Sequence, residues 1–150
     1  MCQQCDYAGI LEESGVGYTG NRLKVLEVIG ESPSPLSAGE ILATLRRTAS
    51  INRVTLYRIL DLLVDNGVLD RLSAGDRSFR YGFAGNANHP RHPHFFCTRC
   101  GSMECLDPES LSVDIRSFQE SFPSLIMKME IRLDGICKDC LGRRGSESGA

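Results

Sequence analysis

The chain has 150 residues, of which 41% are hydrophobic and 24% charged, a composition that excludes a disordered protein, a collagen-like repeat and a coiled-coil rod. Lysine and arginine number 17 against 19 acidic residues, so the net charge does not indicate a generally basic nucleic-acid binder. No apolar run reaches the roughly 18 residues of a membrane-spanning helix, and the N-terminus has no signal-peptide pattern. We therefore expect a cytoplasmic protein with no membrane partner.

The first half of the chain is predicted to be helical and to end in a hairpin. Thr19 can cap a helix that stops at the proline-rich stretch 31–35, and a capping-box pattern over 37–40 opens a second helix. A third helix starts near Asn52 and ends at 66–67, where glycine can take a left-handed cap. Two strands, 68–72 and 78–81, follow with a turn between them. Three helices and a hairpin are the layout of a winged helix-turn-helix.

The third of these helices is the candidate DNA reader. Residues 41 to 60 contain four arginines and no acidic residue, a local positive segment in a mildly acidic chain. In helix-turn-helix proteins the first turns of such a helix enter the major groove, where arginine pairs with guanine or contacts phosphate. The candidate contacts here are Arg53, Thr55, Tyr57 and Arg58. Further arginines that can hold the DNA backbone are Arg46, Arg47, Arg71, Arg77 and Arg80. The alternative is that the arginines form a solvated face.

The second half is predicted to be α+β. Residues 83–93 form a hinge, and the two domains on either side cover 1–82 and 94–141. Within the second domain we expect a helix that starts at Asp107-Pro108 and an alternating, half-buried strand over 125–133. Residues 142–150 are expected to be a disordered tail.

Two Cys-x-x-Cys pairs give the strongest chemical signal. Seven cysteines in a reducing cytoplasm favour metal ligands over a disulfide framework. Two such pairs together complete a tetrahedral four-thiolate zinc site, which would clip the start of the second half to its end. The ligands are Cys97, Cys100, Cys137 and Cys140. The site leaves no open ligand position, so it is expected to be structural. The alternative is a pair of redox dithiols or buried free thiols.

A second cluster contains all three histidines of the chain, His89, His92 and His94, within six residues. The spacing of His92 and His94 puts both rings on one side of an extended strand, and Cys105 on the next strand can come opposite them. Mixed nitrogen and sulfur ligands favour zinc, whereas nitrogen and oxygen alone suit iron or manganese better. The alternative is a solvated histidine loop beside a core thiol. Cys2 and Cys5 can add ligands here, form a third site or be incidental thiols.

The chain resembles the ferric uptake regulator (Fur) family of bacterial metal-responsive repressors. The matching stretches are 19–26, 36–42, 53–67, 92–101 and 137–140. The resemblance implies a homodimer that binds double-stranded operator DNA through N-terminal winged helices and joins through a C-terminal α/β dimerisation domain held by the structural zinc. Metal at the hinge would set the spacing of the two DNA-reading heads. Tyr57 and Arg58 match the recognition-helix pair of the family, and Arg22, in the first matching stretch, is counted with the DNA contacts.

Three departures from the family pattern bear on the metal. Cys105 stands where many relatives have a sensor carboxylate, Gly82 stands where a carboxylate often ends the second wing strand, and Pro35 lies near the place of a missing histidine. The stretch HPHFFCTRCGSMECL is similar to the zinc-type (Zur-like) members. We therefore expect a zinc-responsive repressor, with iron(II) as the alternative effector. The expected sensor ligands are His89, His92, His94 and Cys105, and the alternatives to His89 as the remaining ligand are Cys2, Cys5 or an acidic residue of the wing such as Asp70 or Asp76.

Enzymes and interaction modules are the competing classes of protein. A zinc deaminase needs H-x-E followed by P-C-x-x-C, which the sequence lacks, and a thiol oxidoreductase needs its Cys-x-x-Cys in a thioredoxin-like βαβ pattern. A zinc-stapled redox or interaction protein would not explain the arginine segment without acidic residues. We expect no enzymatic activity and no organic substrate.

Overall fold

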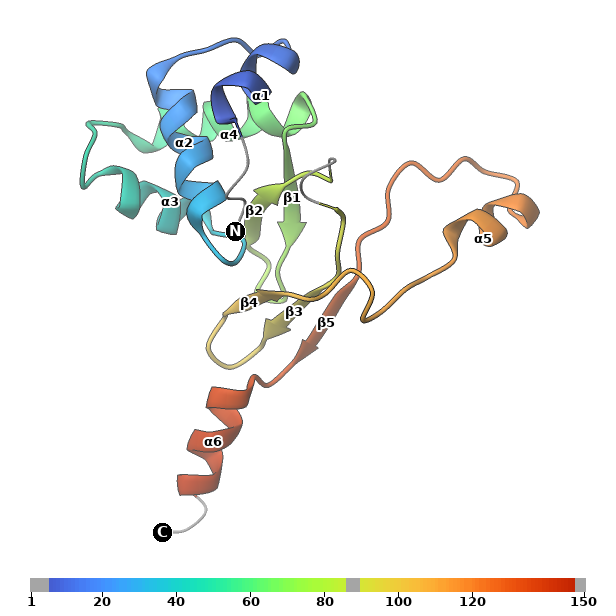
Figure 1. Cartoon of the computed structure of the whole chain (residues 1–150). Coiled ribbons are helices and arrows are strands. Elements are labelled where there is room, and N and C mark those ends of the chain that lie inside the picture. The colour runs from blue at the N-terminus through green and yellow to red at the C-terminus, as the bar shows by residue number, and fades with distance from the viewer. Residues whose placement is uncertain (1–5, 86–89, 148–150) are drawn as a thin grey trace. The chain divides into compact units, whose positions relative to one another are not determined.

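The computed structural model describes residues 6–85 and 90–147 and divides the chain into two compact units, Met1–Arg91 and His92–Ala150 (Figure 1). The division falls inside the segment that the sequence predicts as a hinge. None of the helices in the described residues is long and apolar enough to cross a membrane. The two units are described separately below.

The first unit starts with four helices, α1 (Tyr7–Glu13), α2 (Gly20–Glu31), α3 (Ala38–Leu45) and α4 (Arg53–Asp65). The predicted caps of α2 and α3 are confirmed, because the side chains of Thr19 and Ser37 each accept a hydrogen bond from a backbone N–H in the first turn, and Asn52 caps α4 in the same way. α4 ends at Asn66, and Gly67 follows with a φ of 73°, a conformation that favours glycine. Helix α1 is an addition to the prediction, and Asp6 caps it in the same way.

The wing is an antiparallel hairpin of β1 (Leu69–Ser73) and β2 (Phe79–Phe83), as predicted. Its register runs from Leu69 opposite Phe83 to Ser73 opposite Phe79. A backbone bridge between Leu36 and Tyr81 attaches the segment before α3 to the second strand of the hairpin. The four helices and the base of the hairpin enclose one aliphatic core that includes Leu26, Ile41, Leu45, Leu56, Leu60 and Leu63. One side of α4 packs into this core, and the opposite side of the helix is exposed to solvent.

The second unit contains a three-stranded sheet in the order β4-β3-β5 (Figure 1). The central strand β3 (His94–Cys97) pairs antiparallel with β4 (Met103–Cys105) and parallel with β5 (Arg132–Gly135). Two helices, α5 (Ile115–Ser121) and α6 (Lys138–Glu147), complete the unit. The α+β prediction for the chain is confirmed.

Three predicted elements of the second half are wrong in extent. Asp107 caps a turn, in which it accepts from the N–H of Glu109 at 2.9 Å, and the helix begins only after Asp114, which accepts from the N–H of Ser117 at 3.1 Å. Of the expected strand over 125–133, only Arg132 and Leu133 belong to β5, which continues to Gly135. Residues 125–130 pair with no strand of the described part of the chain, and Ile131 contributes one hydrogen bond, which its carbonyl accepts from the N–H of His94 at 3.0 Å. The predicted half-buried side is also wrong in this chain, because Leu125, Met127, Met129 and Leu133 are exposed.

The tail is the third correction. Residues 142–147, expected to be disordered, continue α6 to Glu147. The second Cys-x-x-Cys turn is itself the first turn of this helix, since Leu141 N–H donates to the Cys137 carbonyl at 2.9 Å. The carboxylate of Asp139, in that first turn, interacts favourably with the positive end of the helix dipole. A nucleated helix continues more easily than a new one starts.

Candidate metal centres and nucleic-acid surface

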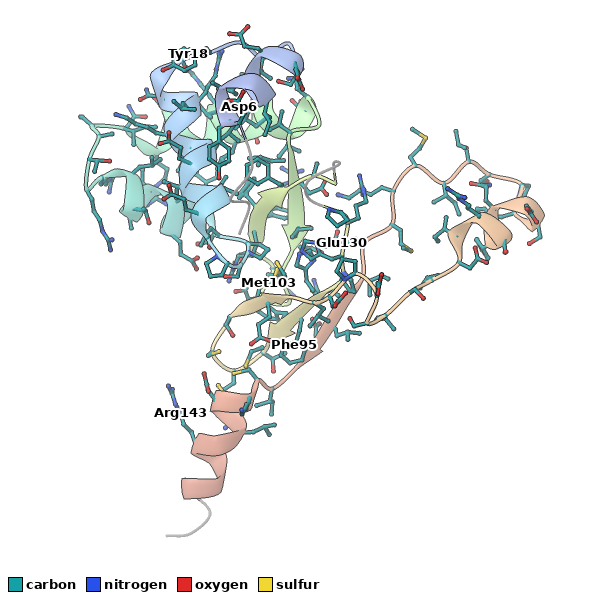
Figure 2. The ribbon with its side chains drawn as sticks, in the orientation of Figure 1. Asp6, Tyr18, Phe95, Met103, Glu130 and Arg143 are labelled. Carbon is teal, nitrogen blue, oxygen red and sulfur yellow. The ribbon has the colours of Figure 1, made fainter. Side chains whose placement is uncertain are left out.

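The four-cysteine centre is built by the parallel pairing of β3 with β5. Cys97 ends β3 opposite Gly135, so the Cys-x-x-Cys turn after β3 lies beside the one that opens α6. The sulfur atoms, yellow in Figure 2, gather where β3 ends and α6 begins. All four lie within 4.8 Å of one another. The sequence prediction that these cysteines form one cluster therefore agrees with the geometry.

The distances between the sulfur atoms fit a tetrahedral zinc site. Cys97 Sγ lies 3.8 Å from Cys140 Sγ, and Cys100 Sγ lies 3.8 Å from Cys137 Sγ. A tetrahedron with Zn–S bonds of about 2.3 Å has edges of about 3.8 Å, whereas a disulfide needs about 2.05 Å. The spacing thus favours a shared ion over two disulfides.

Backbone N–H groups prepare one of these sulfurs as a thiolate. The N–H groups of Cys100 and Cys137 donate to Cys97 Sγ at 3.5 and 3.3 Å, and they lower the pKa of this thiol to about 6. Hydrogen bonds from Ser102 lower the pKa of Cys100 in the same way. Burial and the neighbouring sulfurs raise the pKa of Cys140 to about 12, since adjacent thiolates repel unless a cation lies between them. The sequence analysis missed the contact of Ser102 with Cys100 Sγ. The position of Ser102, two residues after Cys100, is a local signal that could have indicated this contact.

The second centre joins the end of the predicted hinge to the sheet. His94 and Cys105 are directly opposite each other in the antiparallel pair β3–β4, and the ring of His92 lies 4.6 Å from that of His94 between centroids. One ligand atom from each of the three residues lies within 4.8 Å of the others. The Nε2 atom of His92 is buried and makes no hydrogen bond in the described part of the chain. Two imidazoles and a thiol in this arrangement fit three ligands of a zinc ion, whereas iron(II) favours a carboxylate in place of the thiol.

The residues expected to complete this second centre are only partly described. His89, Cys2 and Cys5 lie outside the described residues. In the first unit, a Cβ atom built on Gly82 would lie 3.7 Å from Cγ of Pro35, so the two positions that depart from the family pattern are neighbours in ordinary van der Waals contact. Burial raises the pKa of the Cys105 thiol, so a metal must displace its proton on binding.

The candidate nucleic-acid surface is the outer side of α4. Leu56 and Ile59 are buried in the core, which turns Arg53, Tyr57 and Arg58 outward as exposed side chains, with Thr55 half-buried. Exposed arginines and a tyrosine in the first turns of a helix can reach base edges and phosphates.

Two other arginines have partners inside the first unit. The Arg22 guanidinium donates to the carbonyl of Val16 at 2.8 Å and holds the loop before α2. Arg80 is buried and forms a 3.4 Å ion pair with Asp76 within the hairpin. These contacts hold both guanidinium groups within the first unit, and neither partner follows from helical or strand periodicity in the sequence.

The sequence model of the Ferric uptake regulator family matches residues 13–131. The peroxide-responsive repressor PerR of Staphylococcus aureus is 28% identical over 131 residues, which are 87% of this chain and 86% of that protein.

Solved structures share the fold. The ferric uptake regulator Fur of Helicobacter pylori matches with a TM-score of 0.69 and 20% identity, over 87% of this chain and 86% of that one. A zinc uptake regulator in complex with zinc and DNA matches with a TM-score of 0.66 and 23% identity, over 91% of both chains. Because the family model covers most of the chain, this protein belongs to the ferric uptake regulator family, whose members are metal-responsive transcriptional regulators.

Proposed function

We propose that the protein is a zinc-responsive transcriptional repressor that binds operator DNA as a homodimer when its sensor site is occupied. The observation that carries this proposal is the cluster of His92, His94 and Cys105, in which a thiol takes the place of a carboxylate. The four cysteines hold a separate structural zinc. His89 is proposed as a further sensor ligand, and the proposed DNA contacts are Arg22, Arg53, Thr55, Tyr57 and Arg58.

The sensor acts through linkage between metal and DNA binding. His92 is the first residue of the second unit, so an ion held by His92 and Cys105 ties the end of the linker to the edge of the sheet. An ion that binds the DNA-competent arrangement better than others raises DNA affinity by the same factor, typically about 5- to 150-fold. An ion with equal affinity for both arrangements would change nothing.

Purified protein tests this function directly. Metal content per protomer is measured before and after mild chelation, and DNA ligands are selected from a pool of random duplexes in the presence of zinc. We expect one retained zinc, and a second that is removable and whose return restores DNA binding. Restoration by iron(II) under anaerobic conditions, but not by sub-micromolar free zinc, would make the protein an iron regulator instead. Absence of metal-dependent binding to any duplex would exclude both.

The homodimer is proposed because the second unit leaves many apolar side chains in solvent. Leu125 and Met127 are 77% and 82% exposed. Helix α5, with its stacked Phe118 and Phe122, packs against no other helix or strand in the described part of the chain. Exposed apolar patches of this extent mark interaction surfaces, and a second copy offers the same unmatched surface.

A double variant tests the dimer. Leu125→Glu with Met127→Glu should convert the protein to a monomer by analytical ultracentrifugation, because two carboxylates would be buried in the interface. The monomer should keep its zinc and its helical content, since neither side chain belongs to the described core. Lys24→Glu, at an exposed position of the first unit, is the control and should remain dimeric. An unchanged dimer in the double variant would place the interface elsewhere.

A further inference from the structure

One amide side chain in the second unit bonds the backbone of a loop at three points. Gln119 lies in α5, and its Nε2 donates to the carbonyl of Phe122 at 3.2 Å and to that of Ser124 at 2.5 Å. Its Oε1 accepts from the N–H of Ile126 at 2.7 Å. A carboxamide has two N–H donors and an acceptor oxygen, so these bonds use both donors at once. The loop 122–126 is thus tied to the helix that precedes it.

The loop has little other backbone support. Among the described residues, its one backbone-to-backbone hydrogen bond runs from the N–H of Phe122 to the Gln119 carbonyl at 3.2 Å. Pro123 has no N–H to donate. Gln119 itself is half-buried in a stretch where most neighbours are exposed. Without its amide, the backbone of the loop would be free to adopt many conformations in water.

The loop that Gln119 holds carries apolar side chains in solvent. Leu125 is 77% exposed, and Met127, directly after the loop, is 82% exposed. At the start of the loop, the Phe122 ring stacks on that of Phe118 with 5.0 Å between centroids. Fixing such a loop does not build a core, because these side chains lie outside it. It lowers the cost of binding, since a surface already held in its bound shape loses less conformational freedom on association.

The sequence of this loop suits a second copy of the same chain. Residues 121–127 contain no charged residue. In a two-fold symmetric dimer a segment can face its own copy, and in this one no like charges would meet. A strongly charged partner would find no opposite charge here with which to pair. The loop therefore fits an apolar contact between two copies.

We propose that Gln119 is a positioning residue of the homodimer, which fixes the loop 122–126 so that Leu125 and Met127 meet the partner copy in one shape. This inference rests on the proposed function, because it needs the dimer contact at these two residues. A glutamate could accept from the N–H of Ile126, but it has no hydrogen to donate to the two carbonyls. Alanine would lose all three bonds.

The substitution Gln119→Glu tests this role with little change of shape. We expect the dimer dissociation constant, measured by analytical ultracentrifugation over a dilution series, to rise about tenfold, because two hydrogen bonds are lost and the loop must be ordered on binding. Zinc content and helical content should match the wild type. Asn66→Asp is the matched control, since Asn66 Nδ2 also donates to a backbone carbonyl, that of Leu62 at 2.8 Å, but in the first unit. The control should keep the wild-type dissociation constant.

Hydrogen exchange shows whether the loop is ordered before the partner arrives. In the monomeric double variant with Leu125→Glu and Met127→Glu, we expect the N–H of Ile126 to remain protected, because Gln119 Oε1 still accepts from it. Adding Gln119→Ala in the same background should remove the protection. A residue that only stabilised the fold would not show this local change with zinc still bound.

The outcomes separate the two proposals. If wild-type protein is a monomer, or if the double variant stays dimeric, the proposed dimer contact fails and takes this inference with it. If the double variant is monomeric while Gln119→Glu keeps the wild-type dissociation constant, the dimer contact stands and the positioning role is overturned. Loss of zinc from Gln119→Glu would also overturn it, because Gln119 would then serve the fold of the unit. Free exchange at Ile126 in a monomer that keeps Gln119 would leave the ordering to the partner and overturn it as well.

Discussion

Replacement of Cys105 by aspartate is expected to change the metal to which the protein responds. The residue lies directly opposite His94, so a carboxylate there meets the same two imidazoles. A set of two histidines and one carboxylate suits iron(II) or manganese(II), whereas loss of the soft thiolate weakens zinc binding. We expect zinc affinity at the sensor to drop by about 100-fold or more, because even the loss of a group that only supports a ligand costs roughly 10- to 100-fold.

The measurement is DNA binding titrated with buffered zinc and, without oxygen, with manganese(II) or iron(II). Cys105→Ser is the companion variant and should respond to none of these ions while the protein stays folded and dimeric. The double variant Cys2→Ser with Cys5→Ser shows whether the N-terminal pair supplies ligands to the same ion. An unchanged zinc midpoint in Cys105→Asp would mean that Cys105 is not a ligand.

Cys97→Ser is expected to unfold the second unit. Cys97 is fully buried, its sulfur accepts two backbone N–H groups, and it ends the central strand. Around Cys97, the cluster of buried side chains contains Cys137 and Cys140, with the partly buried Phe95 and Ile136 packed against it. Without the ion, this cluster is too small to hold the unit together. Structural zinc sites supply most of the folding free energy of such units, about 10 to 16 kcal/mol in zinc-finger peptides.

The expected result is loss of zinc, loss of the dimer and rapid proteolysis within residues 92–147. The first unit should survive as a resistant fragment, because its core is made from its own helices and hairpin. Metal analysis, ultracentrifugation and limited proteolysis report these three changes, with Cys105→Ser as the folded control. A Cys97→Ser protein that remains dimeric and protease-resistant would show that the ion does not hold the unit together.

Local signals predicted the first unit well. Thr19, Ser37 and Asn52 each cap a helix through their own side chain, and Gly67 ends α4, so each boundary depends on only a few neighbouring residues. The opposition of His94 and Cys105 was also foreseeable, because a short turn between two strands fixes which residues face each other.

The second half was harder because its boundaries depend on distant partners. The alternation from Leu125 to Leu133 predicts a half-buried strand, but Leu125 and Met127 are exposed, and in the described residues most of this stretch pairs with no strand. The apolar spacing around Phe118 likewise describes a surface and not a core. Arg22 donates to a loop carbonyl and Arg80 pairs with a carboxylate in a turn. Neither contact can be predicted from the periodicity of the sequence.

The parallel pairing of β3 with β5 has a consequence for the order of folding during synthesis. The first unit needs only residues that leave the ribosome early, whereas Cys97 must wait for Cys140, 43 positions later, before the four thiolates can meet. Domains that emerge first generally fold first. We therefore expect each nascent chain to carry a finished DNA-reading head before its zinc clip exists. Zinc supply at the moment of translation would then decide how many chains mature into dimers, independently of how full the sensor is in the finished protein.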